Sequence, residues 1–86
     1  MLFSFFIDKP KDLTATFQKL KVRCEKYKGY LHGNENAGEI SSDGVEGTYE
    51  VEANSVKIVV TKKPFPLIPN SLVEKEIRQI FKEVSM

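Results

Sequence analysis

In Val45-Glu46-Gly47-Thr48-Tyr49-Glu50-Val51-Glu52, residues that suit a buried face alternate strictly with residues that suit water. After a short turn, Val56-Lys57-Ile58-Val59-Val60 continues the buried row, which predicts an antiparallel hairpin with one face in the core. Gly47 falls on the inner face, where a missing side chain is typical of a bulge or of a closely passing helix. Asp43-Gly44, directly before this hairpin, predicts another tight turn.

Three further segments favour strands. Leu2–Ile7 carries apolar residues on both faces, which predicts a strand in the middle of a sheet or one covered on both sides. Tyr30-Leu31-His32 and Glu39-Ile40-Ser41 are shorter candidates, separated by a segment dense in turn formers.

Two amphipathic helices are predicted from apolar residues that recur every three or four positions. In the first helix these residues are Leu13, Phe17, Leu20, Cys24 and Tyr27, and in the last they are Val73, Ile77, Ile80, Phe81 and Val84. We expect Asp8 and Pro10 to open the first helix and Gly29 to end it in the left-handed conformation. Ser71 and Glu74 predict a capping box for the last helix.

The predicted order of elements is therefore β-α-β-β-β-β-α. Strands joined by short turns favour an antiparallel sheet, and amphipathic helices bury their apolar stripes against such a sheet. We predict a single α+β domain over residues 1–86, with an antiparallel sheet of about five strands and two helices on one face.

Composition excludes several classes of protein. A chain that is 41% hydrophobic and 29% charged is ordinary for a globular domain, and its net charge of +1 gives no overall attraction to nucleic acid. Binding of nucleic acid through the basic residues of Lys19–Lys28 is thus the weakest alternative. The apolar run at the N-terminus is too short for a signal peptide or a membrane span, so we expect a cytoplasmic protein.

No residue pattern points to catalysis or to a cofactor. His32 is the only histidine, and Cys24, the only cysteine, lies on the apolar stripe of the first helix, where a thiol behaves as a small hydrophobic group. Metal binding would need further nitrogen or sulfur ligands. We therefore predict a protein that is not an enzyme, with no catalytic residue, no metal and no cofactor.

The connection Lys63-Pro64-Phe65-Pro66-Leu67-Ile68-Pro69 is unusually apolar for a loop. The favoured interpretation is that Phe65, Leu67 and Ile68 fold over the end of the sheet and plug the core. The alternative is an exposed contact, either between two copies of the chain or at the lip of a site for an apolar ligand.

The hairpin, the proline-bearing connection and the closing helix with Val73-Glu74-Lys75-Glu76-Ile77-Arg78 resemble the polyhydroxyalkanoic acid system protein family. These are small bacterial proteins associated with polyester storage, and no catalytic residues are established for them. The β-α-β-β-β-β-α layout agrees over nearly the whole chain. Two features depart from the family: Lys9-Pro10 stands where a histidine is usual, and Tyr30-Leu31-His32 lacks its tryptophan.

Three hypotheses follow for the function. The resemblance implies an accessory or binding protein that acts at hydrophobic surfaces or ligands, with Phe65, Leu67 and Ile68 as its contact. The second hypothesis is a pocket for a small ligand, or an enzyme-like one, between the first helix and the sheet, with Tyr30 and His32 at its mouth. Nucleic-acid binding is the third. Self-association as a homodimer is compatible with each of them.

Overall fold

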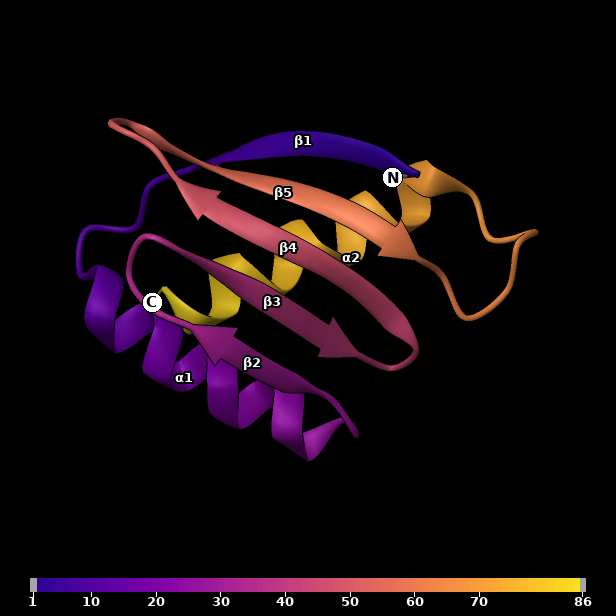
Figure 1. Cartoon of the computed structure of the whole chain (residues 1–86), viewed down its shortest axis with the longest axis horizontal. Coiled ribbons are helices and arrows are strands. Elements are labelled where there is room, and N and C mark those ends of the chain that lie inside the picture. The colour runs from indigo at the N-terminus through magenta and orange to yellow at the C-terminus, as the bar shows by residue number, and fades with distance from the viewer. Residues whose placement is uncertain (1, 86) are drawn as a thin grey trace.

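Strands β4 (Val45–Val51) and β5 (Ser55–Lys62) form the predicted hairpin at the centre of the fold. The computed structural model describes residues 2–85. In it, β1 (Phe3–Asp8) pairs with the free side of β5, while β3 (Ala37–Ser42) and β2 (Tyr30–Gly33) follow on the side of β4. All neighbours are antiparallel, in the order β1-β5-β4-β3-β2 (Figure 1).

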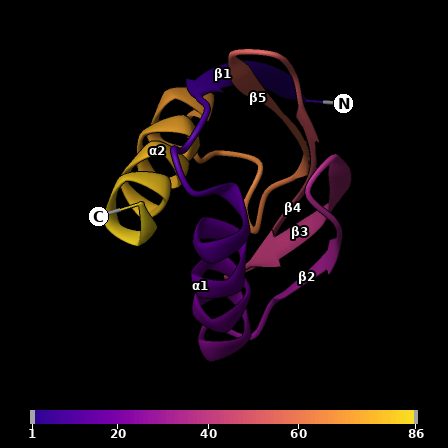
Figure 2. The same ribbon diagram turned by 90° about the vertical axis from the view of Figure 1, so that its left-hand side faces the viewer.

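Both helices, α1 (Leu13–Lys26) and α2 (Asn70–Val84), lie on the same face of this sheet (Figure 2). The sheet curves around them, with α2 beside β1 and α1 beside β2 and β3. The predicted α+β fold, its element order and its sheet are therefore confirmed. Neither helix within residues 2–85 is long and apolar enough to cross a membrane.

The core lies between the helices and the inner face of the sheet. Its most deeply buried residues, each less than 3% exposed, are Leu20, Cys24, Tyr49, Val56, Ile58 and Val60. The ring of Phe17 in α1 stacks on Tyr49 with 4.8 Å between centroids, and it meets Phe81 of α2 edge-on at 6.5 Å. Aromatic contacts thus tie both helices to the sheet.

The predicted central position of the first strand is wrong, because β1 forms an edge of the sheet. Phe5 and Ile7 face the core, whereas Leu2 and Phe6 are 47% and 50% exposed. Within residues 2–85 no element covers this outer face. The predicted self-association therefore remains a hypothesis, for which the apolar residues of β1 are one candidate contact.

Both helices begin differently from the prediction. Strand β1 extends through Asp8, so α1 starts only at Leu13, where the Asp12 carboxylate accepts a hydrogen bond from the Ala15 amide at 3.1 Å. Helix α2 has Pro69 at its N-cap and no side-chain cap, so the predicted capping box is wrong. The Glu74 carboxylate instead pairs with Arg78 at 2.9 Å, one turn along the helix.

The end of α1 also differs from the prediction. Lys28, with φ at +61°, takes the left-handed conformation that was expected of Gly29. Gly29 is required for a different reason: a Cβ at this position would lie 1.7 Å from the carbonyl oxygen of Ser41 in β3. The turn after α1 therefore depends on close backbone contact with the sheet.

This arrangement predicts opposite effects for two neighbouring substitutions. Gly29→Ala should destabilise the fold by roughly 2–4 kcal/mol, because backbone must move to make room for the methyl group. Lys28→Gly should stabilise it by about 1 kcal/mol, because glycine removes the left-handed strain. Urea unfolding of both variants measures the two effects. A larger loss in Lys28→Gly than in Gly29→Ala would contradict this account.

Candidate functional site

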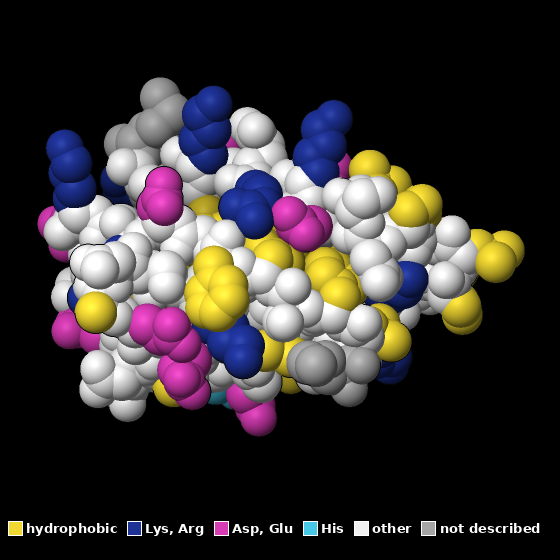
Figure 3. Space-filling model, turned by 90° about the horizontal axis from the view of Figure 1, so that it is seen from above, with side chains coloured by type: hydrophobic (Ala, Val, Ile, Leu, Met, Phe, Trp, Pro, Cys, Tyr) yellow, Lys and Arg dark blue, Asp and Glu magenta, His cyan; other side chains and the backbone are white. Residues whose placement is uncertain are grey.

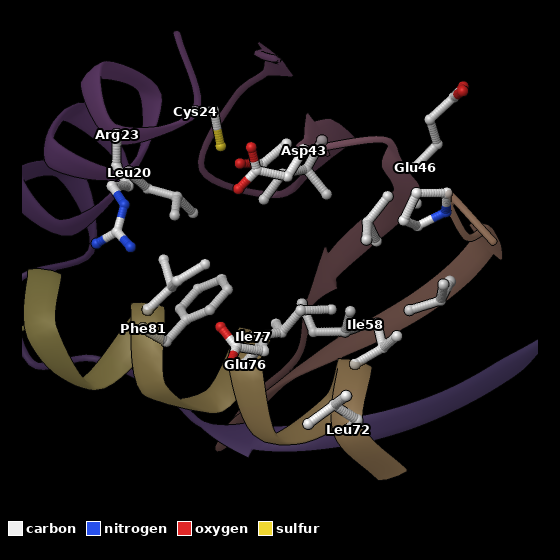
Figure 4. Close-up of a pocket in the computed structure, with 18 of the residues that line it drawn as sticks. Leu20, Arg23, Cys24, Asp43, Glu46, Ile58, Leu72, Glu76, Ile77 and Phe81 are labelled. Carbon is white, nitrogen blue, oxygen red and sulfur yellow. The ribbon is translucent and has the colours of Figure 1, made fainter. Parts of the chain in front are cut away.

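A cavity of about 310 Å³ lies where α1 and α2 diverge above the sheet (Figure 4). Ile58 and Val60 of β5 form its floor, and each is only 1% exposed. Exposed residues such as Leu72, at 48%, lie at its rim, so the cavity opens to solvent. Its further apolar lining comes from both helices, two strands and the β5–α2 loop: Leu20, Cys24, Ile40, Val45, Pro64, Ile68, Val73, Ile77, Ile80 and Phe81.

Two features of the sequence leave this space unfilled. The first is Gly47, which lies in the cavity lining and contributes no side chain to the inner row of β4. A β-bulge accompanies it: Glu46 pairs with Lys62 and Gly47 with Val60, so Thr61 is the extra residue. The second is helix placement, since neither helix comes within 8 Å of β4 or β5, measured between Cα atoms. Side chains alone cover the central strands.

Four charged residues line the cavity: Arg23 of α1, Asp43 of the β3–β4 turn, Glu46 of β4 and Glu76 of α2. In Figure 4 the side chain of Glu46 points away from the cavity, whereas Asp43 and Glu76 approach it from opposite walls. The Glu46 carboxylate pairs with Lys62 at 3.5 Å. Asp43 is held in a left-handed turn, with φ at +54°, and its amide donates to the carbonyl of Tyr27.

Arg23 is anchored within the protein. One of its terminal nitrogens lies 2.7 Å from the Glu83 carboxylate of α2, and its guanidinium lies 4.7 Å from the centre of the Tyr27 ring. The hydrogen bond from Arg23 lowers the pKa of Glu83, and the same bond raises the pKa of Arg23. Nε of Arg23 is buried and has no hydrogen-bond partner within residues 2–85. Arg23 therefore joins α1 to α2 at one edge of the cavity.

The predicted apolar connection divides into two parts. Pro64 and Ile68 line the cavity, and Ile68 packs against the core as predicted. Phe65 and Leu67 are 67% and 94% exposed, so the core-plug interpretation is wrong for both. Figure 3 shows apolar side chains at the right-hand end of the molecule, where this loop projects in Figure 1.

The loop is braced from inside, which explains how it holds these side chains in water. Nζ of Lys63 donates to the carbonyl of Ile68 at 2.6 Å and to the side-chain oxygen of Asn70 at 2.9 Å. The Ile68 amide donates to the carbonyl of Phe65 at 3.2 Å. The chain therefore turns back on itself between Lys63 and Asn70, and Phe65 and Leu67 lie at the outside of the turn.

Tyr30 and His32 lie away from the cavity, contrary to the prediction that they form its mouth. They occupy the outer side of edge strand β2, with their rings stacked at 4.6 Å, while Leu31 between them is buried. His32 and the buried Cys24 therefore face opposite sides of the sheet. A second, shallower hollow of about 400 Å³ between α1 and the β2–β3 turn includes neither aromatic ring of this pair.

Cys24 lies in the cavity lining but is only 2% exposed. Burial raises the pKa of its thiol to about 11, so the nucleophilic thiolate is scarce at neutral pH. This agrees with a structural role. Within residues 2–85 no three His, Cys, Asp or Glu side chains gather closely enough to hold a metal ion.

Comparisons with known proteins identify no relative: no family model, no curated protein and no solved structure matches this chain. The resemblance to the polyhydroxyalkanoic acid system proteins therefore remains a prediction from the sequence. The site is described by its geometry alone.

Sequence reasoning missed the residues at the mouth of the cavity. Arg23 belongs to the basic set of the first helix, Asp43 to a turn signal, and Glu76 to the polar face of the last helix. Nothing local marks them as neighbours. The sequence also marked Gly47, but as the site of a bulge or of a closely passing helix: the bulge is confirmed, whereas no helix comes within 8 Å of β4.

The buried thiol gives a direct test of how closed the cavity floor is. At pH 8, iodoacetamide should alkylate Cys24 in the folded chain at least about 100-fold more slowly than in the chain unfolded by urea, since two pKa units change the thiolate fraction about that much. Mass spectrometry follows the rate. Equal rates in the two states would show that the thiol is reached through the cavity.

Proposed function

We propose that this chain is a non-enzymatic binding protein whose cavity between α1, α2 and the sheet holds a small, largely apolar ligand. The observation that carries the proposal is the cavity itself: its volume of about 310 Å³ falls at the lower end of the range for ligand sites, and most of its lining is aliphatic. A few charged groups stand only at the rim. Such a site selects ligands chiefly by size and apolar character.

Three observations favour binding over catalysis. Cys24 lines the cavity, but its thiol has a raised pKa and the residue is only 2% exposed. His32, the candidate base, lies on the outer face of the sheet. The Glu46 carboxylate points away from the interior (Figure 4). A nucleophile and a base in mutual contact, which covalent catalysis needs, are therefore not brought together by these residues.

The size of the cavity sets the expected affinity. Burying an eight-carbon chain contributes roughly 0.8 kcal/mol per methylene, or roughly 6 kcal/mol in total. Part of this is offset by the lost freedom of the ligand. A simple aliphatic probe should therefore bind with Kd on the order of 0.1–1 mM.

A matched pair of substitutions tests the cavity. Val45 lines it, whereas Val59 lies on the outer side of β5, between the inward residues Ile58 and Val60. Val45→Phe should fill the space and weaken binding of the neutral dye N-phenyl-1-naphthylamine at least about tenfold, because the dye loses its apolar surroundings. Val59→Phe adds the same atoms outside and should leave binding unchanged. Dye fluorescence reports both.

Failure of the wild-type chain to bind this dye or 1-octanol would overturn the proposal. So would equal losses in the two variants, because binding would then not involve the cavity. Thermal unfolding confirms that both variants are folded before they are compared.

A second candidate function is contact with a hydrophobic surface through Phe65 and Leu67. The observation that favours it is their exposure on a loop that Lys63 braces. Exposed apolar side chains held on a structured turn are typical of an interaction site. This is the role implied by the resemblance to polyester-storage proteins, for which such a surface would be the polyester.

Two substitutions at the tip test this second candidate. Phe65→Ser and Leu67→Ser should each reduce retention on a phenyl column or a polyhydroxybutyrate film without lowering Tm, because neither side chain is buried. Val22→Ser is the matched control, since Val22 is 66% exposed on α1, away from the loop. Equal effects of all three substitutions would show that retention is not specific to the tip.

A further inference from the structure

We infer that the ligand of the cavity is a cationic amphiphile: an aliphatic chain in the apolar interior and an ammonium group at the mouth, beside Asp43 and Glu76. This rests on the proposed binding function and adds the chemical class of the ligand. The preference for a head group is set by the charges at the rim that are not already engaged within the protein.

The two carboxylates are available to a ligand. Asp43 and Glu76 are exposed residues that line the cavity from the β3–β4 turn and from α2. Figure 4 shows them on opposite walls of the same opening. Within residues 2–85 neither carboxylate makes a hydrogen bond or an ion pair to another side chain. The charge of Asp43 does act on Arg23: after the hydrogen bond to Glu83, it is one of the charges that raise the pKa of that guanidinium. A cation in the opening would face a carboxylate on each wall.

Arg23, the cation that lines the cavity among residues 2–85, is already engaged within the protein. Arg23 is paired with Glu83 at 2.7 Å and packed against the ring of Tyr27. Its Nε is covered by protein atoms, whereas 30% of the side chain as a whole is exposed. A carboxylate head would in addition lie near Asp43 and Glu76 and be repelled. Charge at the mouth therefore favours a positive head group.

The depth of the cavity determines where the head group lies. The floor is formed by Ile58 and Val60 of β5, each only 1% exposed. No charged side chain lines that end, so an ammonium group is excluded from it by desolvation. The aliphatic chain must point inward and the head outward, toward the two carboxylates.

Three eight-carbon probes that differ only in the head group test the inference at pH 7. Octylamine carries a positive charge there, 1-octanol none and octanoate a negative one. Each probe competes with N-phenyl-1-naphthylamine for binding to the wild-type chain. Each is used below its own critical micelle concentration. We expect the dissociation constant of octylamine, obtained from this competition, to be lower than that of 1-octanol by about tenfold or more. Octanoate should have the highest dissociation constant of the three.

Variants without the two carboxylates then test whether these residues cause the preference for octylamine. Asp43→Asn combined with Glu76→Gln should bring octylamine to within about twofold of 1-octanol while leaving 1-octanol itself unchanged. Glu50→Gln is the matched control, since Glu50 is exposed on β4 and does not line the cavity. It should keep the full preference. Raising the salt concentration should reduce the preference of the wild-type chain.

The outcomes separate this inference from the proposed function. Equal displacement by octylamine and 1-octanol overturns the inference and leaves an apolar cavity. Tighter binding of octanoate also overturns it and would assign the head group to Arg23. Selectivity that survives the double substitution overturns it as well. Failure of all three probes, or sedimentation showing that a second copy of the chain blocks the dye, overturns the proposed function and the inference together.

Discussion

Phe17 of α1 joins both helices to the sheet. Its ring stacks on Tyr49 of β4 and meets Phe81 of α2 edge-on, and the Tyr49 hydroxyl in turn donates to the carbonyl of Asn34 at 2.8 Å. Because no helix backbone approaches the central strands, these large side chains must bridge the gap from helix to sheet. Aromatic rings are suited to this, since each buries a large area and holds a defined geometry.

The cavity lies where no such aromatic ring fills the gap between the helices and the sheet. In the inner row of β4, Gly47 and Val45 lie beyond Tyr49, and the β5 residue opposite Gly47 is Val60. Small aliphatic side chains cannot span the distance that Phe17, Tyr49 and Phe81 span together. The resulting space of about 310 Å³ is lined mainly by apolar side chains and opens to solvent at its rim. This apolar, open space motivates the proposed ligand.

Sequence reasoning succeeded where the determining interactions are local. The period of two in β4, the Asp43-Gly44 turn and the bulge beside Gly47 all depend on residues adjacent in the chain. It failed where the position of a residue depends on an element that is distant in the sequence. β1 is an edge strand because it pairs with β5, about fifty residues later, and Gly29 is fixed by the approach of Ser41. Asp43 and Glu76 likewise become neighbours only in the folded chain.

Residues of one short loop belong to both proposed sites. Pro64 and Ile68 form part of the cavity wall, while Phe65 and Leu67 project from the opposite side of the same turn. The bonds from Lys63 to Ile68 and Asn70 fix these two sides relative to each other. A surface that engages Phe65 and Leu67 therefore acts on a segment that also borders the cavity. The two proposed sites therefore share one short loop whose two sides are held together by internal hydrogen bonds.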